Sequence, residues 1–478
     1  MIFMEQKNEL ELLLNKTDEI RLDEKVNVVF HLSLPGILAQ ISEIVMQYID
    51  ASMVGVLGAT ASASIGLVAS TTWLFFGLIS ACSIGYSVQV AHAIGAGDYT
   101  KAKAIFRQSI VSCLVMSLIY LFIGTIIAPH LPMWLKADQT LWKDATGYFM
   151  LFCLFIPVRQ FSSLFQGMLQ CSGDMKTPSI LIAVSCFLDV IFNFFLIFPT
   201  RVIHLFGTSL TVYGAGLGVL GAQLGTSLSI LVNMLGLFYF TVIKSDKLSL
   251  LMSKGRWIPE SEVIEKAVRI AVPMGLEQAA LTLAQIVSTR IIAPLGTIAI
   301  AAHSFAITAE SICYMPGFGT GAAATTLVGQ SIGAKRLDLA KSFAWVATFF
   351  GITVMTLTAI LMYFLCPYVF QFLTPVEEVQ KLGVTILRIE LFAEPLFAAS
   401  IVSTGALRGA GDTFIPGILN LISIWGVRIP LSYFLTKTMG LPGAWYAMAI
   451  EICIRGVLFL IRLKRENWLK GNTIGDIA

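Results

Sequence analysis

Twelve apolar runs, each about 20 residues long or longer, constrain what this chain of 478 residues can fold into. A helix needs about 20 mostly apolar residues to cross the hydrocarbon core of a membrane. Only 13% of the residues are charged, against roughly 25% in a soluble domain, so a water-exposed surface could not be covered. The sequence therefore predicts an all-α integral membrane protein with twelve transmembrane helices, at residues 28–50, 62–86, 106–129, 145–170, 178–200, 217–243, 267–290, 298–325, 344–366, 382–408, 416–436 and 442–463.

The basic residues alternate from one side of the predicted bundle to the other. Most Lys and Arg residues lie before the first run, in every second loop and after the last run. Because basic loops are retained in the cytoplasm, we expect a multi-pass protein of the plasma (inner) membrane with both termini cytoplasmic. The polar segment 1–26 lacks the basic start and short apolar core of a cleavable signal peptide, so the first helix is expected to act as the insertion signal.

A repeat divides the chain into halves. When the sequence is aligned with itself at an offset of 238, Pro35 meets Pro273, and Gly173-Asp174 meets Gly411-Asp412. Further along, the offset falls to 222, so the first half has an extra segment between its fifth and sixth helices. Halves with an even number of helices insert the same way up, which predicts two six-helix bundles related by a pseudo-two-fold axis along the membrane normal, with a cavity between them.

This repeat also predicts the domain organisation. Two mobile lobes around a central site are a recurring transporter plan, although a duplication kept only for packing is the alternative. Pro35 and Pro273 each remove a helical hydrogen bond early in the first helix of their half, so they are candidate hinges, and a static kink explains them equally well. The predicted parts are a cytoplasmic N-terminal tail (1–26), an N-terminal lobe with helices 1–6 (27–243), a cytoplasmic linker (244–265), a C-terminal lobe with helices 7–12 (266–465) and a cytoplasmic C-terminal tail (466–478).

Polar residues inside the apolar runs are the candidate functional groups. A charged side chain near the bilayer centre costs at least about 2.5–3.5 kcal/mol on insertion scales, so each needs a partner or a role. A carboxyl group in a low-dielectric cavity can exchange a proton near neutral pH, and its oxygens can bind a hard cation such as Na⁺. We expect ion-coupling or substrate-binding roles for Asp50, Asp189, Asn193, Glu277, Glu310 and Glu394.

Other charged residues have packing explanations. Glu390 is better explained by pairing with a nearby arginine such as Arg388 or Arg428. Glu451 and Arg455 are four residues apart on one helix, so an internal salt bridge accounts for both.

One further arginine bears on the candidate site of the first half. Arg159 is a candidate counter-ion of Asp189, which would make that pair structural.

Other classes of function find little support in the sequence. The eight cysteines include no CxxC pair and no Cys/His cluster, which indicates free thiols and no metal centre. No GxxxxGK loop is present, so ATP-driven transport is not supported. A membrane enzyme or receptor would need a catalytic constellation or a large sensory domain, and neither stands out. We therefore expect no enzymatic activity, no cofactor and no nucleic-acid partner.

Six motifs are spread over residues 27–463: Tyr-Ile-Asp-Ala-Ser-Met-Val-Gly (48–55), Gly-Met-Leu-Gln-Cys-Ser-Gly-Asp-Met-Lys-Thr-Pro (167–178), Gly-Leu-Glu-Gln (275–278), Met-Pro-Gly-Phe-Gly (315–319), Thr-Leu-Val-Gly-Gln-Ser-Ile-Gly-Ala (326–334) and Gly-Ala-Leu-Arg-Gly-Ala-Gly-Asp-Thr (405–413). Together they resemble the multidrug and toxic compound extrusion (MATE) family, of the bacterial type. The resemblance implies a secondary active antiporter that exports organic, often cationic, compounds or drugs in exchange for Na⁺ or H⁺ by alternating access. A monomer surrounded by membrane lipid suffices for this mechanism. The alternative is a lipid-linked oligosaccharide flippase of the same superfamily, which predicts a strongly cationic cavity.

The resemblance also implies roles for particular residues. In the N-terminal lobe it implies coupling at Asp50, which follows Pro35 on helix 1, with help from Asp189 and Asn193 on helix 5. In the C-terminal lobe some relatives carry an acid eight residues after the proline of helix 7, where this chain has Leu281. Glu277, one turn earlier, is then the candidate, with Glu394 as its expected partner. Na⁺ is thus expected at either the first set or the second.

Overall fold

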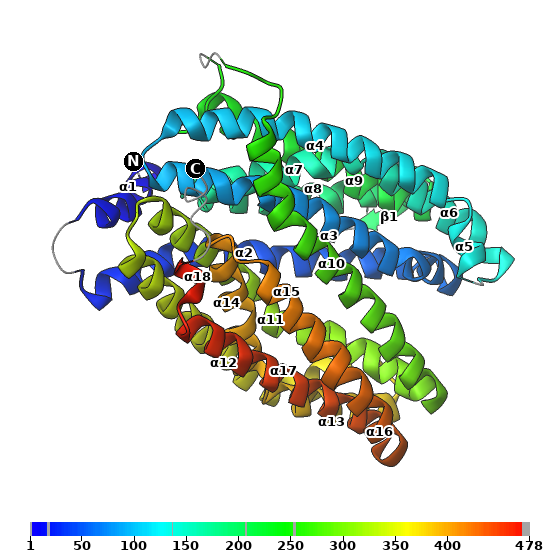
Figure 1. The fold of residues 1–478 in the computed structure, drawn as a ribbon. Coiled ribbons are helices and arrows are strands. Elements are labelled where there is room, and N and C mark those ends of the chain that lie inside the picture. Colours follow the sequence, from blue (N-terminus) through cyan, green and yellow to red (C-terminus); the bar gives the residue numbers. More distant parts are fainter. Residues whose placement is uncertain (1, 17–19, 136, 206–207, 252–254, 471–478) are drawn as a thin grey trace.

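The structure, a computed structural model, describes residues 2–16, 20–135, 137–205, 208–251 and 255–470. Its long helices form two bundles, the N-lobe and the C-lobe, which converge at one end of the molecule and diverge toward the other (Figure 1). The first and last described helices, α1 (Ile2–Asn15) and α18 (Asn467–Lys470), lie at the convergent end (Figure 1). This arrangement agrees with the prediction that the two termini share one side.

The N-lobe consists of the helices α2 (Leu22–Gly55), α3 (Ala59–Gly95), α4 (Tyr99–Ile127), α6 (Gln139–Leu154), α7 (Ile156–Cys171), α8 (Lys176–Leu196) and α9 (Val219–Phe238), the last continued by a π-helical turn (Tyr239–Lys244). The C-lobe consists of α10 (Ser261–Ile292), α11 (Thr297–Gly333), α12 (Leu337–Leu373), α13 (Glu377–Leu391), α14 (Glu394–Gly409), α15 (Phe414–Ser423), α16 (Ile429–Met439) and α17 (Leu441–Lys464), with a 3₁₀ turn at Ala293–Leu295 and a π-helical turn at Ile424–Arg428. The short helices are α1 (Ile2–Asn15), α5 (Leu131–Trp134) and α18 (Asn467–Lys470).

The apolar helices account for most of the predicted spans. Among the described residues, ten helical segments are long and apolar enough to cross a membrane, and α6 with α7 makes an eleventh, bent by 48°. The predicted span 382–408 corresponds to α13 and α14, which are not among these eleven. The all-α membrane architecture is therefore confirmed, and the count of twelve requires α13 and α14 to act together as one broken span.

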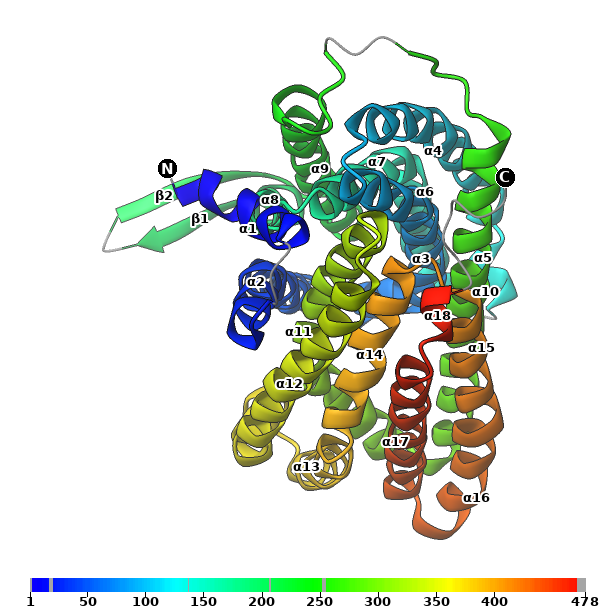
Figure 2. The same cartoon turned by 60° about the vertical axis from the view of Figure 1, so that its left-hand side comes forward.

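The helix boundaries repeat with the predicted offsets. The limits of α3 and α11 differ by 238 in residue number, as do those of α7 and α14, whereas the starts of α9 and α17 differ by 222. The extra segment of the first half forms an antiparallel hairpin of β1 (Pro199–Leu205) and β2 (Thr208–Ala215). Figure 2 shows this hairpin projecting sideways from the N-lobe beyond α8.

The prolines of the repeat occupy two kinds of place. Pro157 and Pro395 lie in the first turns of α7 and α14, directly after the helix breaks. A proline lacks the N–H that the helix interior needs, so the first turn is where it fits best. Pro35 and Pro273 instead lie inside the unbroken helices α2 and α10. Their role as hinges stays a prediction.

The lobes meet along their equivalent first and second helices. α2 packs against α11, α3 packs against α10, and α3 also crosses α11, as a pseudo-two-fold axis between the lobes requires. Close approach depends on glycine, because a Cβ at Gly36 of α2 would lie 3.1 Å from the carbonyl oxygen of Gly319 in α11. The close approach of α2 to α11 at this point therefore rests on contact between two glycine backbones.

Candidate ion-coupling sites

Three polar residues predicted to act together meet in the N-lobe. Asn193 on α8 donates one hydrogen bond from Nδ2 to Asp50 Oδ1 on α2 (2.8 Å) and another to Asp189 Oδ2 on its own helix (3.0 Å). Ser229 on α9 donates to Asp189 Oδ1 (3.2 Å). Asp189 and Asn193 are fully buried, and Asp50 is half-buried. One amide thus bridges two carboxyl groups from different helices.

The N-lobe cluster retains an oxygen atom for a further partner. Asn193 Oδ1 is buried and has no hydrogen-bond partner among the described residues. It lies against Gly225 of α9, where a Cβ would overlap it. The cluster therefore combines carboxylate and amide oxygens, the hard ligands that suit Na⁺, with carboxyl groups that can hold a proton.

The predicted counter-ion of this cluster makes no direct contact with it in the described part of the chain. Arg159 forms no ion pair with Asp189 among the pairs within 4.0 Å in the described part of the chain, and its Nε has no partner. Its guanidinium group instead lies over the ring of Phe152, 4.8 Å from the ring centroid. The Asp189 carboxyl group is thus not neutralised by a direct salt bridge with Arg159.

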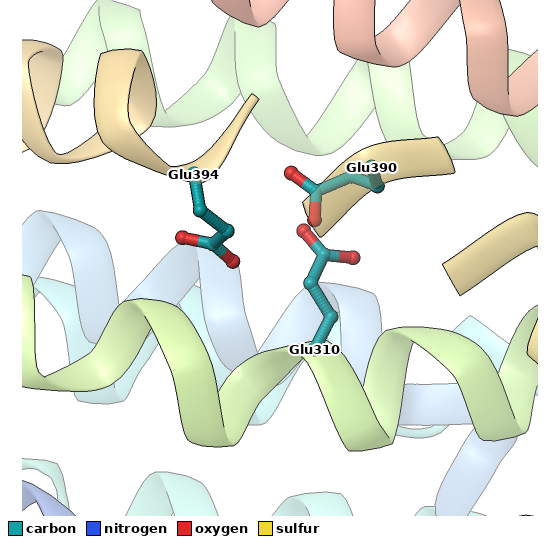
Figure 3. A group of neighbouring side chains, drawn as sticks. All are labelled: Glu310, Glu390 and Glu394. Carbon is teal, nitrogen blue, oxygen red and sulfur yellow. The ribbon is translucent and has the colours of Figure 1, made fainter. Parts of the chain in front are cut away.

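Three glutamates form a second cluster in the C-lobe (Figure 3). Each offers one carboxylate oxygen, and these three oxygens lie within 4.8 Å of one another. Glu310 lies on α11, Glu390 in the last turn of α13 and Glu394 at the start of α14, so the break between α13 and α14 brings two acids to face the third. Glu390 and Glu394 are fully buried, and none of their carboxylate oxygens has a hydrogen-bond partner among the described residues.

Three ionised carboxylates cannot share this space without compensation. At 4.8 Å and an effective dielectric constant of 20, each pair repels by about 3.5 kcal/mol, and three pairs by about 10 kcal/mol. The arginines nearby are engaged elsewhere, since Arg428 Nε and Arg455 Nε lie 3.6 and 3.2 Å from the carboxylate of Glu451. The three-glutamate cluster therefore needs bound protons or a cation to be stable.

Two predicted salt bridges have different outcomes. The pair Glu451–Arg455 is present at 3.2 Å, as predicted. The pairing of Glu390 with Arg388 or Arg428 is not present, and in the described part of the chain neither carboxylate oxygen of Glu390 has a hydrogen-bond partner. Arg388 instead lies over the ring of Tyr363, 4.6 Å from the centroid. Glu390 and Arg388 are close in sequence, but their side chains do not form an ion pair.

Glu277 lies apart from the three-glutamate cluster. It accepts a hydrogen bond at Oε1 from Asn420 Nδ2 (2.6 Å), and its Oε2 lies 3.6 Å from Arg408. With Asn420 and Trp425 it lines a shallow hollow between α10 and the segment from α15 onward. The expected partnership of Glu277 with Glu394 is therefore not formed, because α10 presents its acid to α15 while Glu394 faces α11.

Sequence reasoning missed Glu390 as a member of this cluster. The available signal was the repeat itself, because at the offset of 238 the positions of Glu390 and Glu394 correspond to Phe152 and Ile156 in the N-lobe. Two apolar positions of one half are thus acidic in the other, four residues apart across a helix break. Substitution of buried apolar groups by acids in only one half indicates a local role beyond packing.

Comparisons with known proteins identify the family of this chain. The model of the MatE family matches residues 35–195 and 273–434, more than half of the chain. The "Probable multidrug resistance protein NorM" of Thermotoga maritima is 26% identical over 447 residues, which cover 92% of each chain. A protein of the same name from Streptococcus pneumoniae strain R6 is 25% identical, with 92% of this chain and 95% of the relative covered.

Solved structures agree with the fold. A crystal structure of MATE in complex with MaD3S superimposes with a TM-score of 0.86 at 18% identity and covers 98% of this chain and 99% of the other. An outward-facing MATE family transporter superimposes with a TM-score of 0.85 at 19% identity, with 97% and 99% covered. From these matches and the motifs of both halves, the chain belongs to the MatE family, the multidrug and toxic compound extrusion transporters.

Proposed function

We propose that this protein is a secondary active antiporter that exports organic compounds, with a preference for cations, in exchange for H⁺ or Na⁺. Relatives that span 92% of the chain are named as multidrug resistance proteins. The observation that carries the proposal is the three-glutamate cluster, in which the carboxylate oxygens of Glu390 and Glu394 have no hydrogen-bond partner among the described residues. A group of this kind must bind and release positive charge, and that is the exchange that an antiporter couples to its cargo.

The N-lobe cluster supports the same proposal independently. Asp50 and Asp189 lie on different helices and are joined through one neutral amide. Protonation of either carboxyl group, or entry of a cation, changes the charge between α2 and α8. A helix pair whose spacing depends on that charge can be biased between two states, which is how ion binding is proposed to act on the lobes.

The cargo and orientation follow from charge. Among the described residues, the fully buried acids Asp189, Glu390 and Glu394 have no ion-pair partner within 4.0 Å, and acids of this kind in both lobes favour cationic or neutral cargo over the anionic lipid-linked sugars of a flippase. The basic loops favour a cytoplasmic location for the convergent end of the lobes, where α1 and α18 lie. Cargo then binds in the predicted cavity between lobes, within a monomer in the membrane, and leaves through the divergent end.

Transport in proteoliposomes tests the proposal. Release of a fluorescent organic cation is measured under an imposed H⁺ gradient or an imposed Na⁺ gradient, with Asp50→Asn, Glu277→Gln and Glu394→Gln beside the wild type. The matched control is Glu378→Gln, an exposed acid in the first turn of α13. We expect one gradient to drive release, the control to behave as wild type, and Asp50→Asn or Glu394→Gln to abolish coupling. Full coupling in both of these variants would refute the site assignment.

A further inference from the structure

Among the hydrogen bonds that join the lobes at their convergent end, two form a related pair. His92, in the last turn of α3, lies with Nε2 2.8 Å from the carbonyl oxygen of Gly409, the last residue of α14. Gln330, in the last turn of α11, donates from Nε2 to the carbonyl oxygen of Cys171, the last residue of α7 (2.7 Å). Each bond starts on one lobe and ends on the other.

These two bonds are equivalent under the repeat. The offset of 238 converts position 92 into 330 and position 171 into 409. The donor is a histidine in one half and a glutamine in the other, so the two halves share a contact but differ in the side chain that makes it. Retention of the contact through a change of residue type indicates that the hydrogen bond itself matters.

The acceptors are carbonyl groups that the helix ends leave without a partner. The last carbonyls of an α-helix lack an intrahelical donor. After α7 the backbone N–H groups of residues 173 and 174 bond to the carbonyls of 170 and 169, and after α14 those of 411 and 412 bond to 408 and 407. The backbone N–H groups of these turns thus do not bond to the carbonyls of Cys171 and Gly409. Each is satisfied by a side chain from the opposite lobe.

Between the two bonds, α3 and α11 cross with their backbones in contact. A Cβ at Gly95 would overlap the carbonyl of Gln330, and a Cβ at Gly333 would overlap the carbonyl of His92. These contacts are also equivalent under the offset of 238. Nearby, a Cβ at Gly329 would lie 3.0 Å from the Cβ of Ala91. The crossing therefore leaves no room for a side chain, and none for cargo.

We propose that the His92–Gly409 and Gln330–Cys171 bonds, with the Gly95/Gly333 crossing, form a two-fold lock that closes the convergent end and opens once in each transport cycle. His92 and Gln330 are gate residues, which hold the lobes together without touching the coupling ion. The opening step rests on the proposed antiport, since alternating access requires the closed end to open. The closed lock itself does not depend on which ion drives transport.

The thiol of Cys171 is a native reporter of this lock. It is buried beside the acceptor carbonyl and becomes reachable from the aqueous side only when the convergent end opens. Alkylation by a membrane-impermeant maleimide is followed by peptide mass spectrometry in vesicles that expose this end. Cys153, fully buried within the N-lobe, is labelled only if the lobe unfolds and serves as the internal control.

Removing a donor should speed labelling, and restoring one should reverse the effect. For Gln330→Leu and His92→Leu we expect Cys171 to react about threefold to tenfold faster, the change that the loss of one net hydrogen bond produces. His92→Gln and Gln330→His keep a donor and should label at the wild-type rate. Unchanged Cys171 labelling in both leucine variants, with Cys153 protected, would overturn the lock.

Two further measurements separate the lock from folding and from the proposed function. If a leucine variant exposes Cys153, that variant has unfolded and the lock is tested in the wild type instead. During active transport by the wild type, the labelling of Cys171 must rise and the labelling of Cys153 must not. Absence of that rise while cargo moves would overturn the lock. Failure of ion coupling with the donor-dependent labelling intact would refute the antiport proposal and leave the lock standing.

Discussion

Alanine at Gly225 is the sharpest steric test of the N-lobe site. The new Cβ would overlap Asn193 Oδ1 and lie 3.0 Å from Asn193 Cγ and 3.1 Å from its backbone nitrogen. The amide must therefore swing away from α9. That movement breaks the bonds of 2.8 and 3.0 Å that Asn193 donates to Asp50 and Asp189.

The magnitude follows from those two bonds. A hydrogen bond to a charged group contributes about 1.5–3 kcal/mol, so loss of both removes about 3–6 kcal/mol from the assembled site. Because 1.4 kcal/mol corresponds to a factor of ten, the apparent affinity for the coupling ion should change at least about a hundredfold, and an Na⁺ site, which needs the amide and carboxylate oxygens held together, should weaken by that factor. The fold should survive, since alanine also favours the helix over glycine by roughly 0.5–1 kcal/mol.

A second glycine of the same helix supplies the control. At Gly236 a Cβ would meet only the side chain of Leu181, with its nearest methyl carbon at 3.0 Å, and a flexible methyl can move aside. Cargo release is measured against ion concentration in proteoliposomes, and thermal unfolding is measured in detergent. Gly236→Ala should match the wild type in both assays. A folded Gly225→Ala protein with wild-type ion dependence would refute the assigned role of Asn193.

Four further predictions follow from charges and backbone geometry. Glu394→Gln should raise the thermal unfolding temperature in the absence of a coupling ion, increasingly so at high pH, because it removes the repulsion of about 3.5 kcal/mol per carboxylate pair; a lower temperature would contradict the cluster's electrostatics. Glu451→Gln should destabilise the fold by up to about 3 kcal/mol in the same assay, since it leaves two largely buried arginines without this counter-charge, and an unchanged unfolding temperature would contradict the ion pairs. Lys335 has φ of 58° where the equivalent residue of the first half is glycine, so Lys335→Gly should stabilise by up to about 1 kcal/mol, and a loss of stability would exclude backbone strain there. A hydrogen bond from Lys247 lowers the pKa of Glu11; this contribution to the docking of α1 is complete above the usual pKa of the carboxyl group and is lost as the pH falls through the lowered one. The hydrogen-exchange protection of α1, corrected for the intrinsic pH dependence of amide exchange, should therefore fall on acidification, and unchanged protection would contradict the contact.

The large-scale fold follows from the sequence because its signals are repetitive. Each apolar run is much longer than the uncertainty of a few residues in where it begins and ends. The offsets of 238 and 222 between the two halves of the sequence also recur between the boundaries of the equivalent helices. The meeting of Asp189 with Asn193 is local, since residues four apart share one face of a helix. The contact of this pair with Asp50 could be predicted only with the help of the resemblance to a known family.

The arrangement of the C-lobe site could not be predicted from the sequence in this way. Its geometry depends on the direction of the chain after the break between α13 and α14, and no local pattern determines that direction. Glu394 consequently faces Glu310 and Glu390, while its predicted partner Glu277 contacts Asn420. Sequence proximity also favoured Arg388 as a partner of Glu390, but the arginine packs on an aromatic ring.

Obligatory exchange is tested most directly by substrate-driven ion flux. Proteoliposomes are loaded with an organic cation, no ion gradient is imposed, and the counter-movement of H⁺ is followed with a pH-sensitive dye or that of Na⁺ with a radioactive tracer. The account predicts an opposite flux of one of these ions that stops in the Asp50→Asn/Glu394→Gln double variant. Movement of cargo with neither ion moving in the opposite direction would contradict it.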